Sequence, residues 1–194
     1  MKHKLREGVR RAYSAAAERP HDKHPFPVGY SFAESLGYPD KLLANLPRVS
    51  VDAFSGVSSV SVFAEISVGA TVLDLGCGAG LDSLIAARKV GPQGRVISID
   101  FSDAMLARAR QAAAELSIGN LEFYQVDAEK LPIDDGSIDV ALVNGIFNLN
   151  PEREAIFAEL ARVVREGGAV YAAELILREP LPLEIRDSES DWFA

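Results

Sequence analysis

The chain has 194 residues, of which 48% are hydrophobic and 25% are charged, and its formal net charge is −8. This length and mixture are typical of one folded domain and exclude a disordered or fibrous protein. No run approaches the roughly 20 apolar residues that cross a membrane. The acidic charge argues against a nucleic-acid partner, and one cysteine cannot build a disulfide framework. We therefore expect a cytoplasmic protein without nucleic-acid or membrane partners and without a bound metal.

The first third of the chain is predicted to be helical and is interrupted by prolines. Residues 4–18 have the pattern of an amphipathic helix, and residues 21–30 form a Pro-rich loop. We interpret residues 1–68 as a cap or lid region and residues 69–194 as the ligand-binding domain. Two short helices are expected within the cap, over residues 39–47 and 59–67.

From residue 70 onward, predicted strands alternate with predicted helices. The strands are expected over residues 71–76, 95–100, 121–128, 138–145 and 169–177. The helices are expected over residues 80–90, 102–117, with Ser102 as its cap, and 151–166, ending before Gly167 and Gly168. Apolar strands separated by helices predict an α/β fold with a doubly wound, Rossmann-like parallel sheet. Such sheets bind ligands at the carboxyl ends of their strands, where the strand order reverses.

The turn after the first predicted strand, in the stretch TVLDLGCGAGLDS (71–83), contains glycines at positions 76, 78 and 80. A phosphate-binding P-loop would need Lys-Ser or Lys-Thr after the last glycine, where Leu81 and Asp82 stand. A dinucleotide fingerprint would have its third glycine one residue later. Two interpretations remain: a tight turn without a ligand, or a turn that passes beneath a nucleoside without pyrophosphate, such as S-adenosylmethionine.

Acids at the ends of the next two predicted strands favour the nucleoside. Asp100 lies twenty residues beyond Gly80, where a carboxylate can accept hydrogen bonds from both ribose hydroxyls. The third strand ends in Asp127-Ala128-Glu129, and an acid there can accept from the amino group of adenine. Because the carboxyl ends of parallel strands meet at one edge of the sheet, we expect these acids to converge on the glycine turn.

Four segments resemble the successive motifs of class I S-adenosylmethionine-dependent methyltransferases: VLDLGCGAG, VISIDFSDAMLARAR, VDAEKLPIDDGSIDV and ARVVREGGAVYAAE. The resemblance covers residues 70–178. It implies a Rossmann-like fold, S-adenosyl-L-methionine as the methyl donor, S-adenosyl-L-homocysteine as the product and an activity of class EC 2.1.1.-. It also implies that the cofactor contacts are Tyr13, Asp74, Gly76, Gly78, Gly80, Asp100, Phe101, Met105, Asp127, Ala128, Asn144 and Gly145.

The resemblance also implies which part of the cofactor these residues contact. The motif after the first strand would hold the methionine end, and Asp100 the ribose, with Phe101 and Met105 near the adenine. Asp127 and Ala128 would contact the edge of the adenine. The two residues after the fourth strand would approach the sulfonium, and Tyr13 would lie on a helix that closes over the cofactor.

A finer resemblance, in GPQGRVISIDFSDAML, VNGIFNLNPERE and REPLPLEIR, is to bacterial arsenite methyltransferases and quinone-biosynthesis C-methyltransferases. Arsenite enzymes present thiols at the positions that match Val57, Ser83 and Gly145, and none of these is a cysteine here. Because trivalent arsenic needs thiolate ligands, the chain is expected to use another small-molecule acceptor. Cys77 cannot replace the missing thiols alone, and we interpret it as a small buried residue outside the chemistry.

No motif identifies the catalytic residues. His21 and His24 flank the Pro-rich loop and are candidates for a general base, and Asn148 and Asn150 are candidates for the acceptor pocket. Their alternative role is to cap the helix that begins near Pro151, and Asn150 is the one expected to do so. We expect a methyltransferase that acts on a small molecule. The alternatives are a non-catalytic module that binds S-adenosylmethionine or S-adenosylhomocysteine, a truncated methyltransferase without activity, and a nicotinamide-dependent oxidoreductase, which the early third glycine disfavours.

The end of the chain carries a further expectation. Class I methyltransferases usually add an antiparallel hairpin after the fifth strand, and residues 178–194 are too few for a helix and two strands. We therefore expect the sheet to lack this hairpin. Either the chain is a fragment of a longer protein, or the edge of the fifth strand is covered by the N-terminal helices or by a second copy in a homodimer, because open apolar edges promote aggregation.

Overall fold

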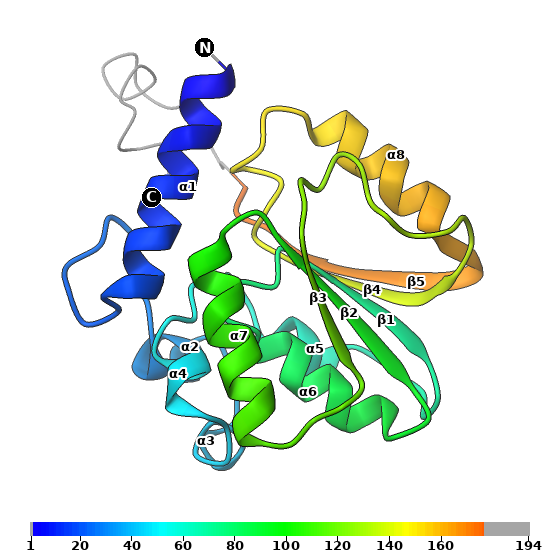
Figure 1. The fold of residues 1–194 in the computed structure, drawn as a ribbon, viewed down its shortest axis with the longest axis horizontal. Helices are drawn as coiled ribbons and strands as arrows, with labels where there is room; N and C mark the ends of the chain where they lie inside the picture. The colour runs from blue at the N-terminus through cyan, green and yellow to red at the C-terminus, as the bar shows by residue number, and fades with distance from the viewer. Residues whose placement is uncertain (1, 177–194) are drawn as a thin grey trace.

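A computed structural model describes residues 2–176 of the chain (Figure 1). Its centre is a sheet of five parallel strands in the order β3-β2-β1-β4-β5. The predicted doubly wound α/β sheet is therefore confirmed. The strands are β1 (Thr71–Leu75), β2 (Arg95–Asp100), β3 (Leu121–Gln125), β4 (Ile138–Asn144) and β5 (Val164–Ala173).

The strands are apolar on both faces because helices cover both faces. Leu73 and Ile97 belong to a core cluster with residues of α8 (Arg153–Val163). Their neighbours Val72 and Val96 belong to a second cluster with residues of α6 (Leu81–Val90) on the opposite face. Helix α7 (Asp103–Glu115) lies beside α6 (Figure 1). The central strands consequently appear in the sequence as nearly continuous hydrophobic runs.

The strand order reverses at β1, which pairs with β2 on one side and with β4 on the other. The chain leaves β1 through α6 toward β2, whereas β4 leads through α8 to the opposite edge. The connections that follow β1 and β4 therefore diverge and leave a crevice beyond the carboxyl ends of these two strands. This crevice is where the sequence predicts the ligand.

Residues 2–68, which we call the cap, cover the side of the sheet that carries α6 and α7 (Figure 1). Tyr38, Leu43 and Val51 share one core cluster with residues of α6 and α7, so the cap has no separate core. Helix α1 contacts α7 beyond the carboxyl ends of the strands. The cap helices are α1 (Lys2–Glu18), α2 (Tyr30–Ser35), α3 (Asp40–Leu43), α4 (Arg48–Val51) and α5 (Val60–Phe63).

The passage from α8 to β5 differs from the prediction. We predicted a helix over residues 151–166 that stops before two glycines, whereas α8 ends three residues earlier and β5 follows at once. The first residue of β5, Val164, pairs with Ile138, and the register then shifts. Gly168 lies within the shifted segment, where a Cβ atom would approach the carbonyl oxygen of Asp139 to 2.9 Å. These glycines therefore form an irregularity in a strand and not the end of a helix.

Strand β5 forms one edge of the sheet, and Val170 on it is 45% exposed. The prediction of a homodimer through this edge stays a prediction. The predicted lack of a C-terminal hairpin concerns residues 177–194, which lie outside the described residues. Among residues 2–176, no helix combines the length and the apolar character needed to cross a bilayer.

Candidate functional site

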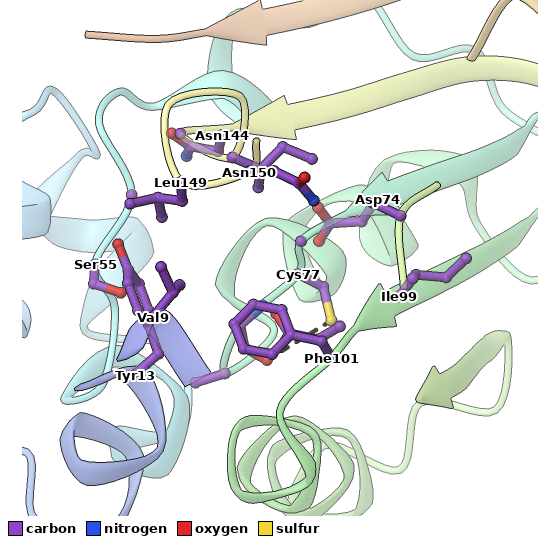
Figure 2. A pocket seen from close by; sticks show the side chains of 18 of the residues that line it. Val9, Tyr13, Ser55, Asp74, Cys77, Ile99, Phe101, Asn144, Leu149 and Asn150 are labelled. Atoms are coloured by element: carbon purple, nitrogen blue, oxygen red, sulfur yellow. Dashed lines mark hydrogen bonds between the residues drawn. The ribbon is translucent and has the colours of Figure 1, made fainter. Parts of the chain in front are cut away.

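A cavity opens at the carboxyl ends of β1, β2 and β4, beneath α1 (Figure 2). It contains about 1100 Å³ of empty space, its solvent-facing mouth included. Val9 and Tyr13 from α1 and Ser55 from the cap face the strand ends across it (Figure 2). Ten predicted cofactor contacts line this cavity: Tyr13, Asp74, Gly76, Gly78, Asp100, Phe101, Asp127, Ala128, Asn144 and Gly145.

The glycine turn between β1 and α6 forms the floor of the cavity. The Gly76 N–H donates to the carbonyl oxygen of Ile99 at 2.8 Å and so ties the turn to β2. All three glycines of the turn have positive φ angles, a region that glycine tolerates best. A Cβ atom at Gly78 would meet nothing within 4 Å, whereas one at Gly80 would lie 2.9 Å from the Cβ of Ala109. Gly78 therefore keeps the floor open, and Gly80, which does not line the cavity, allows α6 and α7 to pack.

Asp100 ends β2 and directs its carboxylate at the glycine turn. Its Oδ2 accepts the Gly78 N–H at 2.9 Å, and its Oδ1 accepts the Ser102 N–H at 2.8 Å. The residue is 7% exposed, and burial raises the pKa of the carboxyl to about 6, although these N–H groups act in the opposite direction. Since each carboxylate oxygen has a further lone pair, Asp100 can accept additional hydrogen bonds from a ligand.

Asp74 on β1 is 2% exposed and lies deeper than the other acids of the cavity. The Ser83 hydroxyl donates to its Oδ2 at 2.5 Å, and the Ser98 hydroxyl lies 2.8 Å from that of Ser83. Burial, followed by the negative charge of Asp82, raises the pKa of Asp74 to about 8. Within residues 2–176, none of Asp74, Asp82 and Asp100 forms an ion pair with a basic side chain. A positively charged ligand would therefore be stabilised at this end of the cavity.

The acids that follow β3 lie under α1 at the other end of the cavity. An Asp127 oxygen is 2.9 Å from Arg6 and 3.8 Å from Arg10, and the Arg10 guanidinium lies 5.7 Å from the ring centre of Phe101. The Oε1 of Glu129 is 3.3 Å from Arg6. Its Oε2 is buried and has no hydrogen-bond partner among the described residues. Glu129 therefore brings an unsatisfied acceptor to the lining of the cavity.

Asn144 ends β4, and its side-chain amide is fully engaged within the protein. Its Oδ1 accepts the N–H groups of Val57 at 2.8 Å and Ser58 at 3.2 Å. Its Nδ2 donates to the Ser58 carbonyl oxygen at 2.7 Å and to Asp82 Oδ2 at 2.8 Å. The next residue, Gly145, has no room for a side chain, since a Cβ atom would lie 3.0 Å from Val57 Cγ1. Asn144 thus offers the cavity a surface but no free hydrogen-bonding group.

Of the two predicted contacts Met105 and Tyr13, only Tyr13 lines the cavity. Met105 is buried in a cluster with Ala16 and Ala17 of α1 and does not line the cavity. Tyr13 reaches from α1 into the cavity beside Ser55 (Figure 2). Burial, and then the nearby charge of Asp100, raises the pKa of the Tyr13 phenol. The phenol is therefore neutral at physiological pH.

Three of the candidates for acid–base and acceptor roles lie outside the cavity. The exposed His21 imidazole is 3.8 Å from Asp52, and the His24 Nε2 is 2.8 Å from the Arg19 carbonyl oxygen. The Asn148 amide donates to a backbone carbonyl of the segment after β5. None of these three side chains lines the cavity.

Asn150 lines the cavity but does not cap α8. The helix begins at Arg153, two residues later than predicted, and its N-cap residue is Glu152. The Asn150 Oδ1 accepts the Glu152 N–H at 2.8 Å in the turn before the helix, and its Nδ2 donates to Glu129 at 3.1 Å. The side chain therefore connects the start of α8 to the end of the cavity that lies under α1.

Cys77 lies in the lining with its thiol buried. The sulfur is 3.7 Å from the Gly78 carbonyl oxygen, to which the thiol donates. Burial, and then the charges of Asp100 and Asp74, raises the pKa of this thiol. It is therefore a neutral and weakly nucleophilic group, which supports a role outside the chemistry.

Sequence analysis missed three charged residues of the lining, Asp82, Arg6 and Arg10. Asp82 was considered only as the residue that rules out a P-loop. Arg6, Val9, Arg10 and Tyr13 are spaced so that they share one face of a helix, and all four line the cavity. That spacing was a usable signal, whereas nothing local in the sequence connects Asp82 to its partners in the cap.

A model of the protein family described as "Methyltransferase domain" matches residues 66–193, which is well over half of the chain. The chain belongs to this family. The methyltransferase domain is of class I, as the parallel sheet and the glycine turn after β1 indicate, and EC 2.1.1.- is the enzyme class of the methyltransferases in this family.

The similar proteins include arsenite methyltransferases. The enzyme from Halobacterium salinarum is 36% identical over 80% of this chain and 40% of its own length. The demethylmenaquinone methyltransferase of Lactococcus lactis is 37% identical over 55% of this chain and 42% of its own length. The crystal structure of an arsenic(III) S-adenosylmethionine methyltransferase from Chlamydomonas reinhardtii matches with a TM-score of 0.68 at 29% identity, covering 75% of this chain and 51% of that one. This methyltransferase domain thus spans about two fifths of the length of these curated relatives.

Proposed function

We propose that this methyltransferase domain binds S-adenosyl-L-methionine in the cavity and transfers its methyl group to a small-molecule acceptor. The observation that carries the proposal is the contact between Asp100 and the glycine turn. A buried carboxylate with free lone pairs lies beside Gly78, where the backbone leaves open space. A ribose fits this arrangement, since its two adjacent hydroxyls can each donate to one carboxylate oxygen.

The nucleoside end supports an adenine. Phe101 follows the ribose-binding acid in the lining and offers an apolar ring face. The unsatisfied Oε2 of Glu129 would gain a donor from the amino group of the base. We therefore add Glu129 to Asp127 and Ala128 as the proposed contacts of the adenine edge. Gly80 and Met105 are not carried into the proposal as contacts, because neither lines the cavity.

The methionine end supports a cationic ligand. Asp82 places a buried carboxylate there, and Asp74, whose pKa of about 8 leaves it largely protonated at neutral pH, would ionise beside a bound cation. No basic side chain among the described residues forms an ion pair with either acid. When bound, S-adenosylmethionine would supply an activated methyl group on a positively charged sulfur. The task of the protein is then to align the two reactants and to exclude water, for which α1 and Phe54 close the side opposite the strands.

The side of the cavity near Gly145 supports an apolar organic acceptor. Its lining includes Phe54, Ile146 and Leu149. Although similar proteins are named arsenite methyltransferases, Val57 packs on Gly145 and Ser83 is hydrogen-bonded to Asp74, so no thiolate stands at these positions. We propose an acceptor other than trivalent arsenic, which requires several soft ligands.

Calorimetric titration with S-adenosylmethionine and with S-adenosylhomocysteine tests the proposal. Asp100→Ala is expected to weaken both affinities about 100-fold, because hydrogen bonds to a charged acceptor contribute about 1.5–3 kcal/mol each. Asp103→Ala is the matched control, since this exposed acid lies 3.7 Å from Arg110 outside the cavity. An excess of NAD should leave the titration unchanged.

Turnover is tested separately by measuring S-adenosylhomocysteine formation with a panel of apolar phenols, quinols and amines. Absence of binding by the folded chain would refute the cofactor site. Binding without turnover across the panel would favour the alternative of a non-catalytic module.

A further inference from the structure

The cap and the sheet meet at the acceptor side of the cavity through one buried polar cluster. It contains Asn144 at the end of β4, Asp82 at the start of α6, and the cap residues Tyr38, Ser58 and Ser61. These residues are far apart in the sequence, so their contacts fix how two separately built parts of the chain join. Two of them, Asp82 and Asn144, also line the cavity.

Every hydrogen-bonding group of the Asn144 amide is used in this junction. As described above, its oxygen accepts two backbone N–H groups of the cap, and its nitrogen donates to Ser58 and Asp82. The fit is close, because a Cβ atom at Gly56 would lie 2.6 Å from Asn144 Nδ2. The segment of the cap that passes Asn144 is therefore held both by its backbone polar groups and by its shape.

Asp82 is the partner that joins this amide to the rest of the cap. Its Oδ1 accepts the Tyr38 hydroxyl at 2.6 Å, the Ser61 N–H at 3.2 Å and the Ser61 hydroxyl. Its Oδ2 accepts the Asn144 amide. A carboxylate that is 5% exposed thus accepts from the cap with one oxygen and from β4 with the other. Such a charged acceptor contributes more than a neutral one would.

We propose that Asp82 and Asn144 are positioning residues, a carboxylate–amide clasp that holds cap residues 55–61 against the ends of β1 and β4 and so forms the acceptor-side wall of the cavity. The inference rests on the proposed function for the meaning of that wall. Ser55 and Gly56, which directly precede the residues bound by Asn144, belong to the lining. Because alignment of two reactants is sensitive to displacements of about 1 Å, a loosened wall would impair transfer without removing any cofactor contact.

Asp82 of the clasp also influences the ionisation of Asp74 on β1. Asp74 is faced by Asp82 and Ser83 of α6, by Ser98 and Asp100 of β2, and by Tyr38 of the cap. Asp82 is the largest of the charge effects that raise the pKa of Asp74, after burial itself. Removing that charge should therefore lower the pH at which Asp74 ionises. An Asp82 side chain that packed there as a neutral group would leave this pH unchanged.

Hydrogen exchange of the peptide covering residues 55–61 tests the clasp without any ligand. Asp82→Asn places an amide against the Asn144 amide, and Asn144→Asp places two carboxylates together, so each should speed exchange at least about tenfold. The double variant restores a donor facing an acceptor and should recover at least half of that change. Asn45→Asp is the control, since this exposed amide donates only to Lys41 on the far part of the cap.

The second measurement is the pH profile of S-adenosylhomocysteine affinity. Its ammonium group favours ionised Asp74, so affinity should rise with pH, and Asp82→Asn should move the rise to lower pH by about one unit or more. Gly56→Ala, whose methyl group pushes on Asn144 without changing a charge, should speed exchange and leave the profile in place. If Asp82→Asn fails to fold, Gly56→Ala still tests whether a disturbed Asn144 speeds exchange.

The outcomes separate the two proposals. If hydrogen exchange in Asp82→Asn and Asn144→Asp is as slow as in Asn45→Asp, the clasp is overturned. Faster exchange with an unmoved pH profile would reduce the cluster to a packing feature and would overturn the positioning role. If the unmodified chain binds no S-adenosylhomocysteine, the proposed function fails, while the exchange experiment still decides whether the clasp holds the cap.

Discussion

The two ends of the cavity are built in different ways. At the proposed nucleoside end, the acids proposed to bind the ligand lie at or after the ends of strands: Asp100 ends β2, and Asp127 and Glu129 come just after β3. At the acceptor end, the wall comes from the cap and is joined to β4 by contacts such as Asn144 to Ser58. The first end depends on local sequence and the second on the docking of distant segments. Sequence motifs can therefore reveal one part of a ligand site and miss another.

The largest effect should come from two glycines of the same motif. Gly78→Val is expected to weaken S-adenosylhomocysteine binding about 100-fold or more, since its side chain would enter the open space of the cavity. Gly80→Val shares the backbone strain of a positive φ but should mainly lower stability, by about 1–3 kcal/mol beyond that strain, because it would press on Ala109. Calorimetry and denaturant unfolding of both variants separate the effects. Equal losses of affinity at equal stability would contradict this division.

The next effect is the pH dependence of stability, which reports the ionisation of Asp74 at the proposed methionine end of the cavity. Asp74 has a raised pKa of about 8 in the folded chain, so the folded state binds more protons than the unfolded state between about pH 4 and 8. Its contribution is therefore full at low pH and is lost as the pH rises to 8. Between pH 6 and 8 the free energy of unfolding should fall by up to about 1.4 kcal/mol per unit.

Urea unfolding at pH 6, 7 and 8 measures this slope. Asp74→Asn should flatten it, whereas Asp103→Asn, an exposed acid at the start of α7, should not. A slope that survives Asp74→Asn would assign the effect to another group, with Asp100, whose pKa is about 6, as the first to test.

A smaller effect is expected at Glu129. Glu129→Gln keeps an acceptor for Arg6 and Asn150 but places an N–H₂ group where the buried oxygen has no partner. We expect S-adenosylhomocysteine affinity to fall about 5- to 10-fold, because a donor would then face the adenine amino group. Glu122→Gln, on the outer part of β3 beside Arg95, is the control. Unchanged affinity in Glu129→Gln would remove this residue from the adenine contacts.

The smallest effect is expected at Cys77. Its thiol donates only a long bond to the Gly78 carbonyl oxygen, and burial keeps the thiol protonated. Cys77→Ala should therefore change cofactor affinity by less than about threefold, within the range of small core substitutions that leave the surroundings in place. A loss of turnover with unchanged affinity would show that the thiol takes part in the reaction.

Most of the fold could be predicted from the sequence because parallel strands and their helices have strong periodic signals. The end of α8 could not, since the pairing of Val164 with Ile138, which makes this residue part of a strand, is a tertiary contact. At the site, the acids after each strand were accessible to sequence reasoning through their position. Asp82 was not, because its partners Tyr38 and Asn144 are distant in the chain. Asn144 was assigned to the cofactor, although its amide is engaged by the cap.

Helix α1 is held unequally along its length, and this has a kinetic consequence. Its second half is anchored by a hydrogen bond between the Ser14 and Ser102 hydroxyls and by Arg108, which donates to the Ala17 carbonyl oxygen. Its first half is held at the mouth by partly exposed ion pairs, of Arg6 and Arg10 with Asp127. Exposed ion pairs are weakened by salt more than these part-buried hydrogen bonds are. Raising the ionic strength should therefore loosen the first half of α1, at the mouth of the cavity, before the second half. The association and dissociation rates of a ligand should then both rise, and the dissociation constant should change less than either rate.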